Sequence, residues 1–294
     1  MNPHLPPRAS PTDSFEYYRF HPSLPAAVTF VALFALATGL HLFQMIRVRT
    51  WFMIPFVIGC GLEAIGYVFR IVSSTEAPGP YSLAPYLLQA VLILIAPTLF
   101  AASIYMELGR IVLMIDGERA LFVRRKWLTK IFVTGDIIAF GIQSSGGSLL
   151  SSDTPSTVDI GNIIVIVGLF AQIIFFGLFI GAATIFHVKM GKAQTQLARE
   201  RPWTKHMISL YIVSALIFIR SIIRVVEYVQ GEDGYIMTHE VFIYVCDAAL
   251  MFAAVVTMSV IHPGQVAKYV RAMESDEYRK CESRESRRNM LEMS

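Results

Sequence analysis

Apolar residues recur along the chain in seven long runs that are separated by short polar connections. A transmembrane helix needs about 20 mostly apolar residues, and every run reaches that length. The runs cover residues 24–46, 51–72, 83–107, 128–150, 160–187, 206–227 and 240–262. The fourth run is the most polar, because Asp136, Gln143 and the small residues that follow interrupt it. The pattern predicts an all-α membrane protein built as a bundle of seven transmembrane helices.

The same pattern divides the chain into three parts. Residues 1–23 form a Pro-rich segment, residues 24–263 hold the seven runs, and residues 264–294 form a charged tail. The first run is too long for the apolar core of a signal peptide, so we expect it to remain as a helix. The tail carries charges of both signs, which favours a solvated and partly disordered extension.

Basic residues alternate from one connection to the next. The first, third and fifth connections and the tail carry most of the Lys and Arg residues, whereas the second, fourth and sixth carry none. Because Lys and Arg gather in cytoplasmic loops, this alternation supports all seven spans. It predicts an extracellular N-terminus and a cytoplasmic C-terminus.

Composition supports a membrane protein and excludes other classes. Apolar residues make up 54% of the chain, charged residues make up 16%, and the mean hydropathy is +0.54. A soluble domain this apolar could not cover its surface with polar groups. Cys60 and Cys246 lie inside apolar runs, so together with Cys281 they do not suggest a disulfide framework.

Ionisable and amide side chains nevertheless occur inside the spans. An ionisable group within a membrane is costly and is interpreted first as functional and paired. The candidates for substrate binding and translocation are Glu63, Arg70, Gln89, Asp136, Gln143, Gln172, Arg220, Arg224, Glu227, Glu240 and Asp247. In four of the helices, pairs of these residues are seven positions apart, which places them within about 20° of each other on an α-helix. We expect four narrow polar stripes that face a shared interior.

The topology sets the depth of this interior. Arg70, Gln89, Gln143, Arg224, Glu227 and Glu240 are expected toward the outside, and Glu63, Asp136, Arg220 and Asp247 nearer the middle of the membrane. The interior should therefore open outward and close at mid-depth. The inner half should be drier, with His41 as its main buried polar residue.

The charges of the interior do not balance. Five acidic residues face three arginines, so three ion pairs would leave two acids over. A surplus acid suits either proton transfer or a cationic ligand. The alternative is that the charged network only locks the helices together.

The absence of known catalytic motifs points away from an enzyme. The chain has no phosphate-binding loop, no zinc-protease motif and no serine-hydrolase motif. We expect a protein that is not an enzyme, has no catalytic residues, metal or cofactor, and binds no nucleic acid.

Gly177 and Gly181 are spaced as a small-residue packing face.

The residues of the polar stripes also form a recognisable series. They read Glu63-x-x-Gly66-Tyr67-x-x-Arg70 in the second run, Gln89, Ala96-Pro97, Ala101-Ala102-x-x-Tyr105 and Gly109-Arg110 in and after the third, Asp136, Gln143 and Gly146-Gly147 in the fourth, Gly168-x-x-x-Gln172 in the fifth, Arg220-x-x-x-Arg224-x-x-Glu227-Tyr228 and Gly231 around the sixth, and His239-Glu240-x-x-x-Tyr244-x-x-Asp247 and His262-Pro263-Gly264 in the last. In order and spacing, this series resembles the fungal lipid-translocating exporters, RTA-like seven-transmembrane proteins linked to aminocholesterol resistance. The resemblance extends over nearly all of the spans.

The resemblance implies a fungal membrane protein that exports or confers tolerance to amphiphiles such as sphingoid long-chain bases, sterol-like amines or porphyrin. The first hypothesis is a translocator of sphingoid bases, most plausibly in the plasma membrane with a vacuolar membrane as the alternative. The second is a seven-helix lipid sensor or receptor that acts through a cytoplasmic partner of the tail. The sequence leaves the oligomeric state open.

Overall fold

The described part of the protein is entirely helical. The computed structural model describes residues 23–76, 82–121, 124–150, 154–231 and 240–275, and these ranges contain no strand. The elements are α1 (Leu24–Val48), η1 (Trp51–Met53), α2 (Ile54–Thr75), α3 (Leu83–Met114), η2 (Glu118–Ala120), α4 (Arg125–Leu149), α5 (Pro155–Lys192), α6 (Gln196–Glu200), α7 (Trp203–Gln230), α9 (Glu240–Phe242), the π-helix η3 (Ile243–Ala249) and α10 (Leu250–Val260). Residues 264–275 form a further helix.

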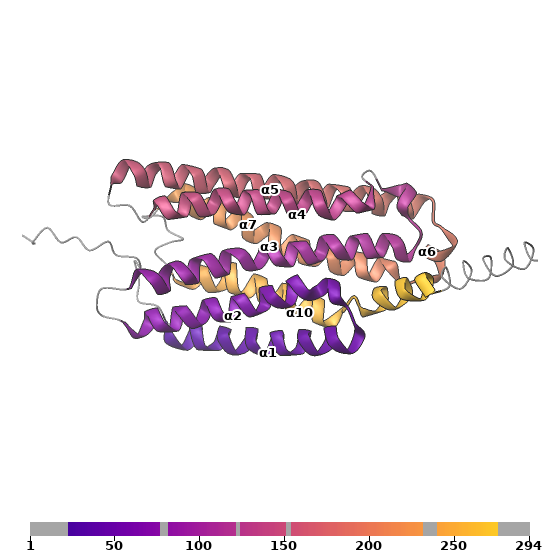
Figure 1. Cartoon of the computed structure of the whole chain (residues 1–294), viewed down its shortest axis with the longest axis horizontal. Helices are drawn as coiled ribbons and strands as arrows, with labels where there is room; N and C mark the ends of the chain where they lie inside the picture. Colours follow the sequence, from indigo (N-terminus) through magenta and orange to yellow (C-terminus); the bar gives the residue numbers. More distant parts are fainter. Residues whose placement is uncertain (1–22, 77–81, 122–123, 151–153, 232–239, 276–294) are drawn as a thin grey trace, which may run out of the picture.

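The long helices lie side by side in one elongated bundle (Figure 1). Consecutive helices pack against each other from α1 to α5, α7 follows against α5, and α10 packs against both α7 and α1. The long helices therefore form a ring that closes on itself. Helix α3 also contacts α7 across the bundle, so it carries many of the fully buried side chains.

Six helical segments of the described chain are long and apolar enough to cross a membrane. They correspond to every predicted span except the fourth. Helix α4 has 25 residues and packs between α3 and α5, but Arg125, Lys130 and Asp136 make it more polar than the others. The protein is thus a multi-pass membrane protein, and a seventh span through α4 stays a prediction.

The observed helices extend beyond the apolar runs. Helix α3 continues to Met114, where the run ended at residue 107, and α5 covers Pro155–Lys192 instead of 160–187. Residues 108–114, which extend α3, are apolar except for Gly109 and Arg110, so the apolar run itself is longer than predicted.

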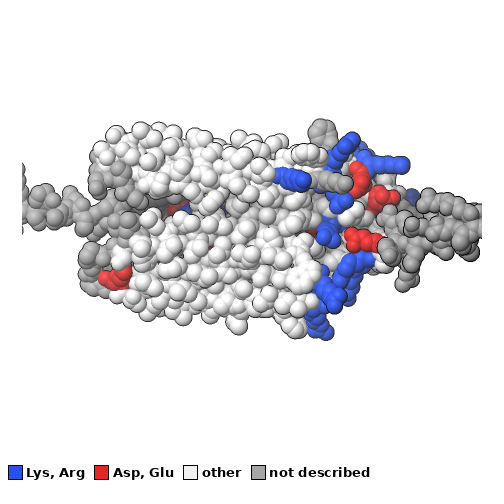
Figure 2. Space-filling view, viewed as in Figure 1, with Lys and Arg blue, Asp and Glu red and all other residues white. Residues whose placement is uncertain are grey.

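Basic side chains gather at one end of the bundle, while the flank between the two ends is almost free of charge (Figure 2). This is the end that the positive-inside rule assigns to the cytoplasm. The start of the predicted tail also lies there and is not a solvated extension, because Val266, Ala267 and Val270 are buried. Residues 1–22 and 276–294, which hold most of the predicted N-terminal segment and tail, are outside the described part.

Close packing of α4 on α5 occurs at glycines other than the expected pair. A Cβ atom on Gly161 would lie 2.9 Å from the carbonyl oxygen of Gly146, so the two backbones touch directly. By contrast, a Cβ atom on Gly181 would meet nothing within 4 Å, and one on Gly177 would meet only a Phe218 carbon at 3.8 Å. The expectation of a packing face at these two glycines is therefore wrong.

We predict that Gly161→Ala destabilises the protein and that Gly181→Ala does not. The first substitution forces α4 and α5 apart and should cost about 1–3 kcal/mol, the usual range for overpacking. The second adds a good helix former in open space and should stabilise by up to about 1 kcal/mol. Thermal unfolding of the purified variants in detergent measures both, and equal effects would contradict the packing described.

The chain turns between α10 and the last helix at His262. The backbone N–H of Gly264 donates a hydrogen bond to His262 Nδ1 at 3.1 Å, which requires an unprotonated Nδ1. Burial, together with the positive charge that His41 and His206 would add, lowers the pKa of His262 from 6.5 to about 4. The turn therefore depends on a neutral imidazole.

We predict that stability falls as the pH drops from 6.5 toward 4. In this window the unfolded chain binds a proton at His262 and the folded chain does not, so protonation favours unfolding. His262→Asn keeps a hydrogen-bond acceptor without titrating, and it should flatten this part of the curve. Melting temperatures across the pH range test the prediction, and a variant with the same pH profile as the natural protein would refute it.

Candidate functional site

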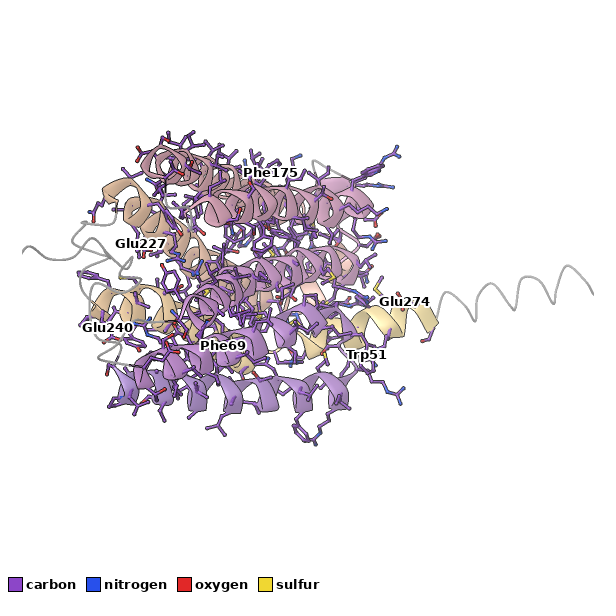
Figure 3. The ribbon with its side chains drawn as sticks, turned by 60° about the vertical axis from the view of Figure 1, so that its left-hand side comes forward. Trp51, Phe69, Phe175, Glu227, Glu240 and Glu274 are labelled. Atoms are coloured by element: carbon purple, nitrogen blue, oxygen red, sulfur yellow. The ribbon has the colours of Figure 1, made fainter. Side chains whose placement is uncertain are left out.

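Buried charges concentrate where α2, α7 and the π-helix η3 meet. Glu227 and Glu240 lie toward one end of the bundle, opposite Trp51 and Glu274 (Figure 3). The spans thus carry charges toward the end away from the basic cluster, where the sequence places the outside of the membrane.

Arg70 of α2 joins this helix to the last span. Its Nη2 donates to Glu240 Oε1 at 2.8 Å and its Nε donates to Tyr244 Oη at 2.9 Å, while its guanidinium lies 5.1 Å from the centre of the Tyr244 ring. Glu240 Oε1 also accepts from the backbone N–H of Ser23 at 2.7 Å, so the start of α1 is bound to the same group. Arg70 itself is fully buried.

Arg220 of α7 forms the second ion pair, with Asp247 of η3. Its Nη2 also donates to the carbonyl oxygen of Ile93 on α3 at 3.1 Å. This arginine therefore connects three elements in the middle of the bundle.

Arg224 forms the third pair within its own helix. Its Nη1 donates to Glu227 Oε2 at 2.8 Å, three residues further on, and its guanidinium lies 5.8 Å from the centre of the Tyr228 ring. Local pairing of this kind suits a structural role.

Glu63 is an acid of this region that has no such partner. Its side chain is fully buried, and neither carboxylate oxygen has a hydrogen-bond partner in the described chain. Asp247, Arg220 and Arg224 are its main electrostatic neighbours. The hydroxyl of Tyr67, one turn further along α2, is also buried without a partner. Polar atoms buried without partners are costly, and here they lie together beside the Arg220–Asp247 pair.

Asp136 belongs to a second group, on α3, α4 and α5. Its Oδ2 accepts a hydrogen bond from Tyr105 Oη at 2.7 Å, and its Oδ1 is buried without a partner. Gln143 Nε2, two turns further along α4, donates to Gln172 Oε1 of α5 at 2.9 Å. Gln89 is buried in the first half of α3. The described contacts therefore divide the predicted residues into two groups instead of one shared interior.

The expected stripe of the last span is altered by the π-helix. Glu240 and Asp247 are seven residues apart, but η3 has wider i→i+5 turns than an α-helix. Glu240 consequently pairs with α2 and Asp247 with α7. The seven-residue spacing correctly identified the polar residues of this span but not their common direction.

The interior is closed in this structure. The exposed fraction of the side chain is 3% for Arg220 and 0% for Arg70, and it rises to 17% for Arg224 and Glu240. Exposure does not follow depth, because Arg70 is bound to Glu240 and is nevertheless fully buried. The outward opening stays a prediction.

Glu107 was missed by the sequence analysis. It lies in α3 near the basic end, is fully buried, and neither of its carboxylate oxygens has a partner in the described chain. It is the last residue of the third apolar run and does not belong to the predicted set of polar residues. His206 and Ser209 are also buried at this end. The expectation of a dry inner half, with His41 as its main polar residue, is therefore wrong.

The described residues offer no ligand set for a metal, because they contain no suitable group of three or more His, Cys, Asp or Glu side chains. Cys60 and Cys246 are free thiols.

We predict that Glu63 and Asp247 are energetically coupled through Arg220. Asp247→Asn removes one counter-ion, and breaking a buried pair typically costs about 3–5 kcal/mol, but Glu63 can then neutralise Arg220. The Glu63→Gln/Asp247→Asn double variant should lose about 0.5–3 kcal/mol more than the sum of the single variants. Thermal or denaturant unfolding in detergent measures this cycle.

The exposed Glu118 provides the control for this cycle. It pairs with Arg125 at the surface, where ion pairs contribute little. Glu118→Gln should therefore be additive with Asp247→Asn. Additivity in both cycles would mean that Glu63 does not act on Arg220.

Comparison with known proteins identifies the family of this chain. A family described as RTA1-like protein matches residues 56–269. Protein RTA1 of Saccharomyces cerevisiae is 36% identical, with 85% of this chain and 86% of that protein covered. The protoporphyrin uptake protein 1 of the same yeast is 34% identical, covering 85% and 93%, and its sphingoid long-chain base transporter RSB1 is 27% identical, covering 83% and 72%.

No solved structure significantly matches the chain. The family match covers more than half of the sequence and includes both groups of buried polar residues, which confirms the resemblance found in the motifs. The chain belongs to the RTA1-like family.

Proposed function

We propose that this protein translocates amphipathic lipids with a cationic head group, most plausibly sphingoid long-chain bases, across the fungal plasma membrane. The observation that carries the proposal is the Glu63 carboxylate, which is fully buried and has no hydrogen-bond partner in the described chain. A primary ammonium group can donate hydrogen bonds to such a carboxylate, and charge-assisted bonds of this kind are strong.

The surroundings of Glu63 suit the rest of such a head group. A sphingoid base carries hydroxyl groups beside its amine, and the unpartnered Tyr67 hydroxyl lies one turn from Glu63 on α2. The aromatic rings of Phe30 and Phe34 stack near Tyr67, with ring centres 5.6 and 6.0 Å away, and offer apolar contact to the start of a long chain.

The ion pairs supply a means of opening and closing. Arg220 is bound to Asp247 and lies in the field of Glu63, so it has two carboxylates within electrostatic reach. An incoming ammonium group at Glu63 competes with this arginine. Because the chain has no phosphate-binding loop for ATP, transport would run down the lipid gradient or be driven by protons through a surplus acid such as Asp136.

The relatives give the proposal its substrate class. One relative is named as a sphingoid long-chain base transporter and another as a protoporphyrin uptake protein. Both names concern amphiphiles. The surplus of buried acid over arginine favours the cationic amphiphile for this chain.

A lipid sensor is the second candidate, and the packed helix 264–275 favours it as a route for a signal from the bundle to a partner of the tail. Because this helix is part of the fold, a deletion that separates the two functions must begin after Ser275. Such a deletion should spare translocation and abolish signalling.

We predict that Glu63→Gln and Asp136→Asn each slow leaflet exchange of a fluorescent sphingoid base in liposomes that contain the purified protein. Loss of a hydrogen bond to a charged group is worth about 1.5–3 kcal/mol, so exchange should fall about tenfold to a hundredfold. Glu118→Gln, at the exposed surface, is the matched control and should exchange at the natural rate. Unchanged exchange in both buried variants would refute translocation through this site, and binding without any exchange would favour the sensor.

A further inference from the structure

A hollow of about 490 Å³ lies at the basic end, between the end of α1 and the helix 264–275. Four basic residues line it: Arg47 and Arg49 at the end of α1, and Lys268 and Arg271 in the helix 264–275. Val48 and Ser275 also line it. This site is separate from the buried acids of the membrane interior, since it lies at the opposite end from Glu240 and Glu227 (Figures 2 and 3).

Within the described residues, the positive charge of this hollow is uncompensated. None of its described lining residues is acidic, and none of the four basic side chains forms an ion pair with another described residue. Four like charges around one hollow repel each other, and an anion placed among them would relieve this repulsion.

Specific contacts hold the two sides of the hollow together, so it is not only a result of membrane topology. Arg271 donates from Nη2 to the carbonyl oxygen of Val48 at 2.7 Å and from Nε to that of Ala267 at 3.1 Å. A Cβ atom on Gly264 would lie 2.7 Å from a methyl group of Val48, so the glycine permits close approach. Arg49 ends α1 in the left-handed conformation with φ of 56°. The positive-inside rule explains basic loops, but it does not require residues more than 200 positions apart to share one hollow.

An apolar track leads to the hollow along α1. Leu36, Leu40, Phe43 and Arg47 fall within about 60° of one another around the helix at 3.6 residues per turn. The three apolar members are exposed, Leu36 by 73% and Phe43 by 58%. Trp51, also exposed, follows just beyond the hollow, and tryptophan is typical of the membrane–water boundary. A molecule with an anionic head and apolar chains fits this arrangement, with its head among the basic residues and a chain along the track.

We propose that this hollow binds an anionic phospholipid of the cytoplasmic leaflet whose head group carries a phosphomonoester, such as a phosphorylated phosphatidylinositol. The number of uncompensated positive charges favours a head group with more than one negative charge. Basic pockets at the cytoplasmic ends of transmembrane helices are typical sites for such head groups. The inference does not depend on which lipid the interior transports.

The test uses the full-length protein in nanodiscs of phosphatidylcholine that contain a small fraction of fluorescent phosphatidylinositol 4-phosphate. Retention of the fluorescent lipid is compared for the natural protein, Arg49→Gln/Lys268→Gln and the control Lys189→Gln/Lys192→Gln. The control removes the same charge from the end of α5, at the same end of the bundle but outside the hollow. Melting temperatures of all three proteins are measured to establish that the variants fold.

We expect binding of the phosphorylated lipid to weaken about tenfold in Arg49→Gln/Lys268→Gln, which corresponds to about 1.4 kcal/mol, and to be unchanged in the control. Inorganic phosphate at millimolar concentration should not compete, because it lacks the apolar chains. Equal losses in both variants would show a diffuse basic surface, competition by phosphate would show a free-anion site, and retention no better than that of phosphatidylcholine would show no site. Each of these three outcomes overturns the proposal. Leaflet exchange of the sphingoid base is measured in parallel. It tests the proposed translocation through the membrane interior and does not depend on the basic hollow.

Discussion

Every arginine between the membrane-spanning helices needs a counter-ion, because an unpaired charge in this medium is costly. This constraint determines which helices meet. Lipid is as apolar as the helix surfaces, so hydrophobicity alone does not hold transmembrane helices together. The Arg70–Glu240 pair instead holds α2 against the last span, and the Arg220–Asp247 pair holds α7 against it. Where no charges meet, direct backbone contact at glycine joins α4 to α5.

The same constraint explains why Glu63 and Asp136 stand out. Once each arginine has taken one acid, these two predicted residues are left with unbonded oxygens in the described chain, as is Glu107 near the basic end. They also occupy different environments: Glu63 lies in the field of two arginines, whereas Asp136 is held by a tyrosine hydroxyl alone. A carboxylate near an arginine can exchange partners with a ligand, while one buried without a counter-ion is better suited to hold a proton. The two carboxylates thus differ in the chemistry that is open to them.

Much of this arrangement could be predicted from the sequence, because hydrophobic runs and charge counts are local properties. The runs located the helices, and the excess of acids over arginines predicted two surplus carboxylates. The identity of the pairs could not be predicted, since spacing within a helix does not say which neighbour it faces. The π-helix separates the directions of Glu240 and Asp247, and Glu107 lies at the end of the predicted third run, although the helix continues to Met114. Gly161 packs closely and Gly181 does not, and the two differ in what lies opposite them. The sequence near each glycine does not show this.

Helix α1 connects the two ends of the molecule in a way that neither site alone reveals. At its start, the Ser23 backbone N–H is bound to Glu240, which also holds Arg70. At its end, the Val48 carbonyl is bound to Arg271 beside the basic hollow. A continuous helix of 25 residues is about 37 Å long at 1.5 Å per residue and moves as one body. Although only 17% of its apolar window is buried, α1 packs along α2 and also contacts α10. Helix α1 therefore joins the residues around Glu240 to the segment that lines the basic hollow, because each of its ends is bound to one of these places.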